Sequence, residues 1–131
     1  MLRHSDSEKI TINLGFVDLG HVDLLVRDGF YSNRTDFIRT AIRNQLATHA
    51  AALNQSASRK SLSLGLQHYG RQQLEELRAA GERIDIRALG LVRIAADVTP
   101  ELARATIGSI TVLGALQVSA AVRTALSDRI S

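Results

Sequence analysis

The chain has 131 residues, 45% of them hydrophobic and 22% charged, a composition typical of a globular protein with one domain or two small ones. It has no cysteine, which excludes disulfides and thiolate metal sites. The net charge of +3 does not by itself indicate nucleic-acid binding, and the hydrophobic runs are too short and too often interrupted to span a membrane.

The segment 9–14 alternates strictly between polar and hydrophobic side chains. The polar set is Lys9, Thr11 and Asn13, and the hydrophobic set is Ile10, Ile12 and Leu14. This period of two predicts a β-strand with one buried and one exposed face. No second strand follows nearby, and an isolated strand leaves its backbone polar groups unpaired. The simplest partner is the same strand of a second copy, antiparallel about a two-fold axis, so we expect a two-stranded ribbon packed on four helices.

Two helical patterns follow this strand. Hydrophobic residues at offsets of three and four predict a first helix from about Val17 to Arg27. Asn33 is the expected N-cap of the second helix, and Asp36 stands at its third position, where a carboxylate meets free N–H groups. The Ser- and Asn-rich segment 54–60 is then expected to be a linker.

The strand KITINL, the turn DGFYSNRTD and the helix start FIRTAIR together resemble the ribbon-helix-helix family of DNA-binding proteins, the class of Arc, MetJ and CopG. The resemblance covers about the first third of the chain. The family usually has a proline after the strand, where this chain has Gly15 and Phe16, but Gly15 still permits the turn. The resemblance implies that the three outward strand residues read DNA bases.

The chemistry of these outward residues suits base recognition. A two-stranded ribbon fits the major groove of B-DNA, for which the family members MetJ and Arc are established examples. Lys9 can donate to guanine O6 or N7, Asn13 can pair with adenine, and Thr11 offers a hydroxyl and a methyl suited to thymine. Without the family pattern, the same three residues would more often be a solvated strand face.

The start of the second helix is the expected phosphate clamp, since its free N–H groups and dipole attract anions. The predicted phosphate-contacting residues are Ser32, Asn33, Arg34 and Thr35. Arg39 and Arg43 are interpreted as a solvated or ion-paired helix face instead. The predicted dimer core consists of Ile10, Ile12, Leu14, Val22, Leu25, Val26, Phe37, Ile38, Ala41, Ile42 and Leu46.

No pattern in the chain indicates catalysis or a metal. The histidines His4, His21, His49 and His68 are scattered, without carboxylates or thiols at ligand spacing. Some ribbon-helix-helix proteins carry a nickel-sensing C-terminal domain, but its histidine-plus-cysteine pattern is absent here. No paired carboxylates, phosphate loop or nucleophile–histidine pair is recognisable. We therefore expect no catalytic residues, no metal, no cofactor and no enzymatic activity.

The second half contains a repeat. The triplets at 64–66 (LGL), 89–91 (LGL) and 113–115 (LGA) recur at steps of 25 and 24 residues, each within alternating hydrophobic sequence and each followed by a helical pattern. Thr99 and Pro100 are a clear helix start. Three strand–helix units predict a short α/β solenoid with parallel strands and right-handed crossovers. A small three-stranded α+β domain is the competing interpretation.

These observations lead to an α+β chain with three parts: a ribbon-helix-helix domain over residues 8–53, a linker over 54–60, and a strand–helix repeat region over 61–131 for oligomerisation or partner binding. The expected function is a sequence-specific, DNA-binding transcriptional repressor, a homodimer that forms higher oligomers through 61–131. Its expected partner is double-stranded DNA, without a membrane, in the cytoplasm at the nucleoid. The alternatives are an antitoxin that represses its own operon and a DNA-anchored, self-assembling scaffold.

Overall fold

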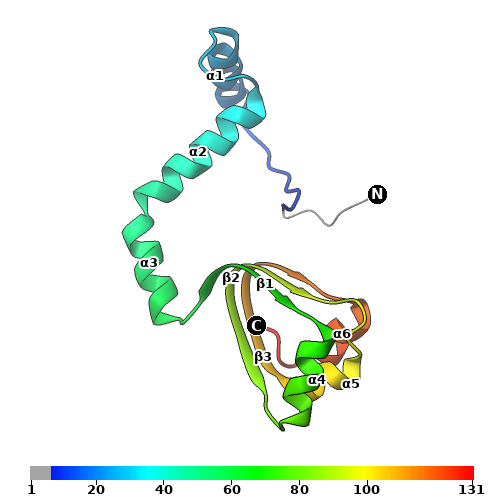
Figure 1. Cartoon of the computed structure of the whole chain (residues 1–131). Coiled ribbons are helices and arrows are strands. Elements are labelled where there is room, and N and C mark those ends of the chain that lie inside the picture. Colours follow the sequence, from blue (N-terminus) through cyan, green and yellow to red (C-terminus); the bar gives the residue numbers. More distant parts are fainter. Residues whose placement is uncertain (1–6) are drawn as a thin grey trace. The chain divides into compact units, whose positions relative to one another are not determined.

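A computed structural model describes residues 7–131 of the chain (Figure 1). The chain forms two compact units, Ser7–Ser56 and Ala57–Ser131, whose boundary falls inside a helix. The segment 54–60, expected to be a linker, is helical up to Arg59. The domain boundaries derived from the sequence stay predictions, since a helical connection and a domain boundary do not exclude each other.

The N-terminal unit contains α1 (Phe16–Arg27) and α2 (Arg34–Thr48), and α3 (Ala50–Arg59) follows directly. The observed α1 agrees with the expected range to within one residue at its start. Gly29 ends it with a φ of 86°, the left-handed conformation that glycine adopts at low cost. Within α1 and α2 the single buried residue is Val22, so these helices have little core of their own.

Residues 8–15 belong to neither a helix nor a sheet in the single chain. The antiparallel ribbon expected from residues 9–14 is therefore not confirmed, because no strand within residues 7–131 lies beside this segment. A two-fold ribbon requires the second copy, and a single chain cannot supply it.

The C-terminal unit is a three-stranded sheet with helices between and after its strands. Its elements are β1 (Ser63–Tyr69), α4 (Arg71–Ala79), β2 (Ile84–Ile94), α5 (Pro100–Thr106), β3 (Ile107–Gln117) and α6 (Ala120–Ala125). The strand order is β1-β2-β3 and both pairs are parallel, so the prediction of parallel strands is confirmed. The solenoid interpretation stays a prediction.

The three helices lie on the same side of the sheet and pack against one another in chain order, α4 on α5 and α5 on α6 (Figure 1). Alternate residues of β2 face them: Ile86, Ala88, Val92 and Ile94 are all buried. The rest of this core consists of Leu74, Val98, Leu102, Ala103, Ile107, Ile110, Val122 and Leu126. As expected, Thr99 caps α5 by accepting a hydrogen bond from the Leu102 N–H at 3.2 Å, with Pro100 in the first turn.

The C-terminal residues cover the start of the β3 edge. Ile130 forms a parallel bridge with Ile110, whose N–H donates to the Arg129 carbonyl at 2.9 Å and whose carbonyl accepts from the Ser131 N–H at 2.8 Å. The Arg129 guanidinium donates to the carbonyls of Arg104 and Ile107 at 2.7 and 2.8 Å, which holds this tail in place. The helices of residues 7–131 are all too short or too polar to cross a membrane.

A row of glycines crosses the sheet at the centres of the three repeats. The register places Gly65 next to Gly90 and Gly90 next to Gly114. Gly90 has a φ of +141°, and a Cβ there would collide with the Gly65 carbonyl oxygen. Both the backbone conformation and the close approach of the neighbouring strand therefore require glycine at this position.

This geometry predicts that Gly90→Ala destabilises the C-terminal unit by on the order of 3 kcal/mol, since backbone strain and a backbone clash add. The matched control is Gly81→Ala, where φ is +69° but no atom lies within 4 Å of the added Cβ. It should cost only about 1 kcal/mol, the strain alone. Urea denaturation of both variants measures the difference, and equal losses of stability would contradict the role of the glycine row.

Candidate nucleic-acid interface

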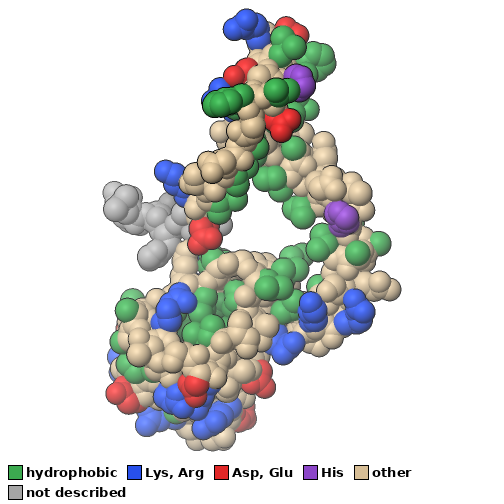
Figure 2. Space-filling model, turned by 180° about the vertical axis from the view of Figure 1, so that it is seen from behind, with side chains coloured by type: hydrophobic (Ala, Val, Ile, Leu, Met, Phe, Trp, Pro, Cys, Tyr) green, Lys and Arg blue, Asp and Glu red, His purple; other side chains and the backbone are tan. Residues whose placement is uncertain are grey.

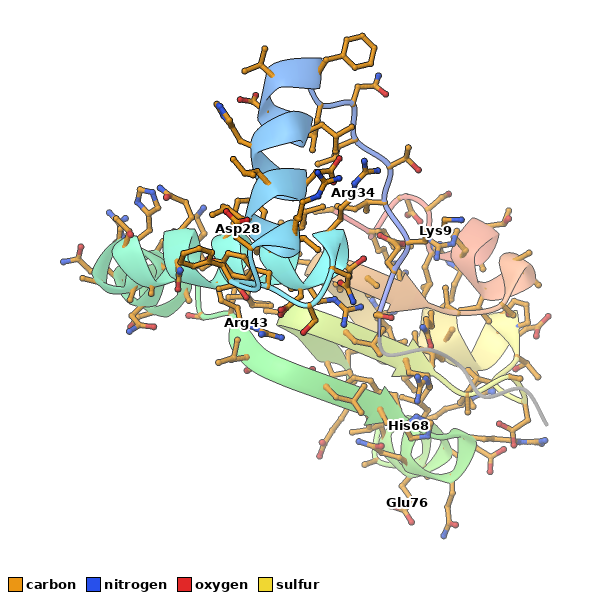
Figure 3. The ribbon with its side chains drawn as sticks, turned by 90° about the horizontal axis from the view of Figure 1, so that it is seen from above. Lys9, Asp28, Arg34, Arg43, His68 and Glu76 are labelled. Atoms are coloured by element: carbon orange, nitrogen blue, oxygen red, sulfur yellow. The ribbon has the colours of Figure 1, made fainter. Side chains whose placement is uncertain are left out.

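The segment before α1 exposes the predicted base-reading residues. Lys9, Thr11 and Asn13 are all exposed in the single chain, and Figure 3 labels Lys9 on this segment. The segment enters α1 through Gly15, whose carbonyl accepts the first helical hydrogen bond, from the Leu19 N–H at 3.0 Å. The three polar side chains are thus accessible to a ligand.

The turn between α1 and α2 is fixed by a reciprocal cap. The Asn33 side chain accepts a hydrogen bond from the Asp36 N–H at 2.8 Å, as expected for an N-cap. The Asp36 carboxylate in turn accepts from the Ser32 N–H at 2.9 Å. These bonds leave the N–H groups of Arg34 and Thr35, in the first helical turn, without an intrahelical acceptor.

Arg34 binds α1 in this structure. Its guanidinium forms a bidentate ion pair with Asp23, with Nε–Oδ1 at 2.7 Å and Nη2–Oδ2 at 2.8 Å. The hydrogen bond from Arg34 lowers the pKa of Asp23, and the same bond raises the pKa of Arg34. Both side chains are about half exposed, at 56% and 48%, so the pair is accessible from solvent.

Sequence reasoning missed this ion pair. Asp23 and Arg34 are eleven residues apart, with a turn between their helices, so no helical or strand periodicity connects them. Only the crossing of α1 and α2 brings the two charges together. Of the four predicted phosphate-contacting residues, Thr35 alone has no intramolecular hydrogen bond in the described part of the chain apart from those within its helix.

An apolar groove of about 420 Å³ lies between the segment before α1 and the two helices. Its lining residues are Ile12, Leu14, Asp18, His21, Val22, Leu25, Phe37, Ile38, Ala41 and Ile42. Figure 2 shows hydrophobic side chains exposed on the surface of this unit. An apolar groove with exposed hydrophobic side chains around it is a candidate interaction surface.

The predicted dimer core is mostly exposed in the single chain. Val22 alone among its residues is buried, whereas Ile10 is 72% exposed, Ile12 60% and Leu46 53%. Most of the set lines the groove, but Ile10, Val26 and Leu46 do not. Burial of these side chains in a shared core therefore requires a second copy of the chain.

Other predicted features of this half are less informative. Tyr31 packs edge-on against Phe37 at the turn, with ring centroids 5.1 Å apart, whereas Phe30 is 69% exposed. Arg39 and Arg43 are exposed on α2 (Figure 3 labels Arg43). His4 lies outside the described residues, and within residues 7–131 no group of three or more His, Asp or Glu is placed to hold a metal ion.

The comparison with known families extends this description. The sequence model of the ribbon-helix-helix transcriptional regulator family matches residues 5–123, which includes the repeat region as well as the segment that resembles the family. No curated protein and no solved structure is significantly similar to the chain. Because the family match spans most of its length, the chain belongs to the ribbon-helix-helix transcriptional regulator family.

Proposed function

We propose that this protein is a dimeric transcriptional repressor that inserts a two-stranded antiparallel ribbon, residues 9–14 of both copies, into the major groove of DNA. Family membership suggests DNA binding, dimerisation and transcriptional regulation, and the family is typically non-enzymatic. The observation that supports the ribbon is the division of this segment into two faces. Ile12 and Leu14 line the apolar groove, whereas the alternating polar residues Thr11 and Asn13 do not.

The exposed hydrophobic surface supports the dimer. Full burial of one large aliphatic side chain is worth about 1.5–3 kcal/mol, and several such side chains of this unit are exposed. They include Ile10, Ile12, Leu14, Ile42 and Leu46. The second copy fills the groove with its own helices, and its strand pairs with the unpaired backbone of residues 9–14.

The ribbon presents one outward row from each copy to the bases. Lys9 donates to guanine O6 or N7, Asn13 donates to and accepts from adenine, and Thr11 contacts thymine or either base edge. The phosphate clamp lies at the start of α2, where the N–H groups of Arg34 and Thr35 face outward along the helix axis. The hydroxyls of Ser32 and Thr35, the Asn33 amide and the remaining N–H groups of Arg34 add further donors.

Repression follows from occupation of an operator, with residues 61–131 joining dimers on adjacent sites, and the site of action is the nucleoid in the cytoplasm. The antitoxin alternative requires a C-terminal part that neutralises a toxin, usually a segment disordered on its own. The C-terminal unit instead has a core with Leu74, Ala88, Val92 and Ile110 fully buried, which favours the assembly role.

The base-reading role predicts that replacing Lys9, Thr11 and Asn13 by alanine removes sequence preference without unfolding the dimer. Each lost bidentate or polar contact should cost about 1–3 kcal/mol of discrimination. The control is Lys60→Ala, the other lysine of the chain, in the turn after α3. The measurement is the ratio of two affinities of the full-length protein, one for the DNA upstream of its own gene and one for random DNA. Unchanged preference in the triple variant would contradict ribbon readout.

Arg34 and Asp23 can be separated by conservative substitutions. Arg34→Gln should weaken binding to all sequences alike and reduce the slope of log K against log salt by about one. Asp23→Asn also breaks the ion pair but leaves the cation, so its affinity for DNA should be equal or higher. If both variants lose affinity to the same degree, Arg34 acts by holding α1 and not by binding phosphate.

The Asp23 ion pair should also depend on pH in a defined direction. Because the folded pKa of Asp23 lies below its usual value of 3.8, the ion pair stabilises the folded protein at neutral pH. This stabilisation is lost as the pH falls through the lowered pKa. Comparisons of Arg34→Gln and Asp23→Asn therefore belong near pH 7, where the pair is fully formed in the wild type.

The shared core predicts that Ile42→Asp disrupts the dimer. A carboxylate in the groove should weaken association by at least about a hundredfold, because a buried unpaired charge costs on the order of 3 kcal/mol. Leu53→Asp is the matched control, since Leu53 is 44% exposed on α3 and does not line the groove. Specific DNA binding of Ile42→Asp at wild-type concentrations would refute the shared core, because the ribbon requires both copies.

A further inference from the structure

The sheet of the C-terminal unit has two open edges on one chain. In the part of the chain that the structure describes, β1 has β2 on one side and no strand on the other, and β3 has β2 on one side and only the short C-terminal tail on the other. The tail pairs with Ile110, and within residues 7–131 no strand pairs with Val112 to Leu116 on the side of β3 away from β2. Open edges of this kind are templates for pairing with another chain.

Leucine side chains line both edges on the face turned away from the helices. The register aligns Leu64, Leu89 and Leu113 in one row and Leu66, Leu91 and Ala115 in the next. None of these six residues belongs to the core on the helix side. The exposed fractions are 85% for Leu64, 57% for Leu66 and 51% for Leu113, all on edge strands, whereas Leu89 and Leu91 on the central strand are half-buried. The edge residues thus lack the neighbour that the central residues have.

The glycine row shows which neighbour fits. Gly90 and Gly114 have φ values of +141° and +119°, and in each the space of the missing Cβ is occupied by the carbonyl of the glycine on the preceding strand. Close Cα–H···O=C contacts of this type recur between adjacent strands. Gly65 has a φ of +114°, but no atom of residues 7–131 occupies the corresponding space within 4 Å. β1 therefore has the backbone conformation of a strand that follows another.

We propose that β1 of a second copy of this chain adds to β3 in parallel, so that Gly65 of the incoming copy lies beside Gly114. This continues the register of the existing strand pairs, in which each glycine follows another. Leu64 of the incoming copy then extends the row that ends at Leu113, and its Leu66 extends the row that ends at Ala115. The existing register also aligns Ser63 with Ala88 and Ala88 with Val112, so the incoming strand starts just beyond the tail-covered Ile110.

The same addition places α4 of the incoming copy next to α6, in the relation that α4 has to α5 and α5 to α6 within one chain. The three strand–helix units then act as coils of a solenoid that continues from copy to copy. Because the β3 edge and the β1 edge are different surfaces, the contact is head-to-tail and generates a ring or an open array, unlike the two-fold contact of the ribbon.

This inference names the partner and the geometry of the proposed assembly on DNA. The role of the assembly on DNA rests on the proposed function, but the pairing of β1 with β3 does not. Dimers joined in this way bind adjacent half-sites with a high effective concentration, which strengthens binding without further base contacts. An array can therefore form, or fail to form, independently of whether the ribbon reads DNA.

Engineered cysteines test the pairing directly, since the natural chain has none. The full-length double variant Leu64→Cys/Leu113→Cys, oxidised at concentrations where assembly occurs, should give a ladder of covalent oligomers, because neighbouring strands bring Cα atoms into disulfide range. Each single variant should stay monomeric on a denaturing gel. Self-linking of Leu64→Cys alone, or of Leu113→Cys alone, indicates like-to-like edges and would overturn the proposal. The control Leu64→Cys/Thr111→Cys shifts the register by two residues and should link poorly.

Edge substitutions give a second, independent measurement by sedimentation velocity. Leu64→Lys should reduce assembly beyond the dimer by about tenfold or more, since a lysine on an open edge opposes strand addition, and its high exposure means that folding is not impaired. The double variant Leu64→Lys/Leu113→Glu should restore assembly through an ion pair between copies. Leu53→Lys, at an exposed leucine of α3, is the control.

The glycine geometry has its own variant. Gly65→Ala fills the space required by the Gly114 carbonyl and should abolish species larger than the dimer, while Gly81→Ala, also at positive φ, should leave them intact. Single dimers of Gly65→Ala and Leu64→Lys should still bind DNA sequence-specifically. If the wild-type protein also lacks sequence-specific DNA binding, the result counts against the proposed function and not against the edge pairing. Wild-type protein that remains dimeric at about 100 μM, with and without DNA, would overturn the proposed edge pairing.

Discussion

Backbone hydrogen bonding is the constraint on which both units of this protein depend. A peptide N–H or C=O removed from water must find a partner, and an extended segment finds it only beside another strand. Residues 9–14 have no neighbouring strand among the described residues of their own chain, although Ile12 and Leu14 line the apolar groove. The C-terminal sheet pairs its central strand on both sides from Ala88 to Arg93, and within residues 7–131 no strand pairs with the outer edge of β1 or with most of the outer edge of β3. In both units, backbone groups of a single chain are left without a strand to pair with, and a strand of a second copy could supply the partner.

The proposed contacts of residues 9–14 and of the edges of the C-terminal sheet differ in symmetry, which suits separate roles in DNA reading and in assembly. A ribbon of two identical strands is two-fold symmetric, as is the backbone of a short stretch of duplex DNA. The proposed pairing of the β1 edge of one copy with the β3 edge of another has no two-fold axis and extends in one direction. With a net charge of only +3, non-specific attraction to phosphate is modest, so linking several dimers is an effective way to gain affinity.

The regularity of the repeat is what makes register possible. Steps of 25 and 24 residues bring the glycines side by side and align the leucines that flank them. A glycine row allows neighbouring backbones to approach more closely than any Cβ permits, which fixes one alignment and penalises a slip by a single residue. The core beside it is aliphatic, in keeping with an aromatic content of 4%, and depends on the even packing of short helices against the sheet.

The sequence by itself determined what depends on local periodicity and on single residues: the bounds of α1, the caps at Asn33 and Thr99, and the three parallel strands that the repeat requires. These follow from nearest-neighbour geometry, which a linear pattern records. Only the tertiary structure decided that Arg34 binds Asp23, that the C-terminal tail covers Ile110, and that residues 54–59 are helical. The first two depend on how separate elements pack in space, which the periodicity of one chain does not record. The helix over 54–59 differs from the expected linker because the Asn and Ser residues of this segment, which favour turns, also occur in helices.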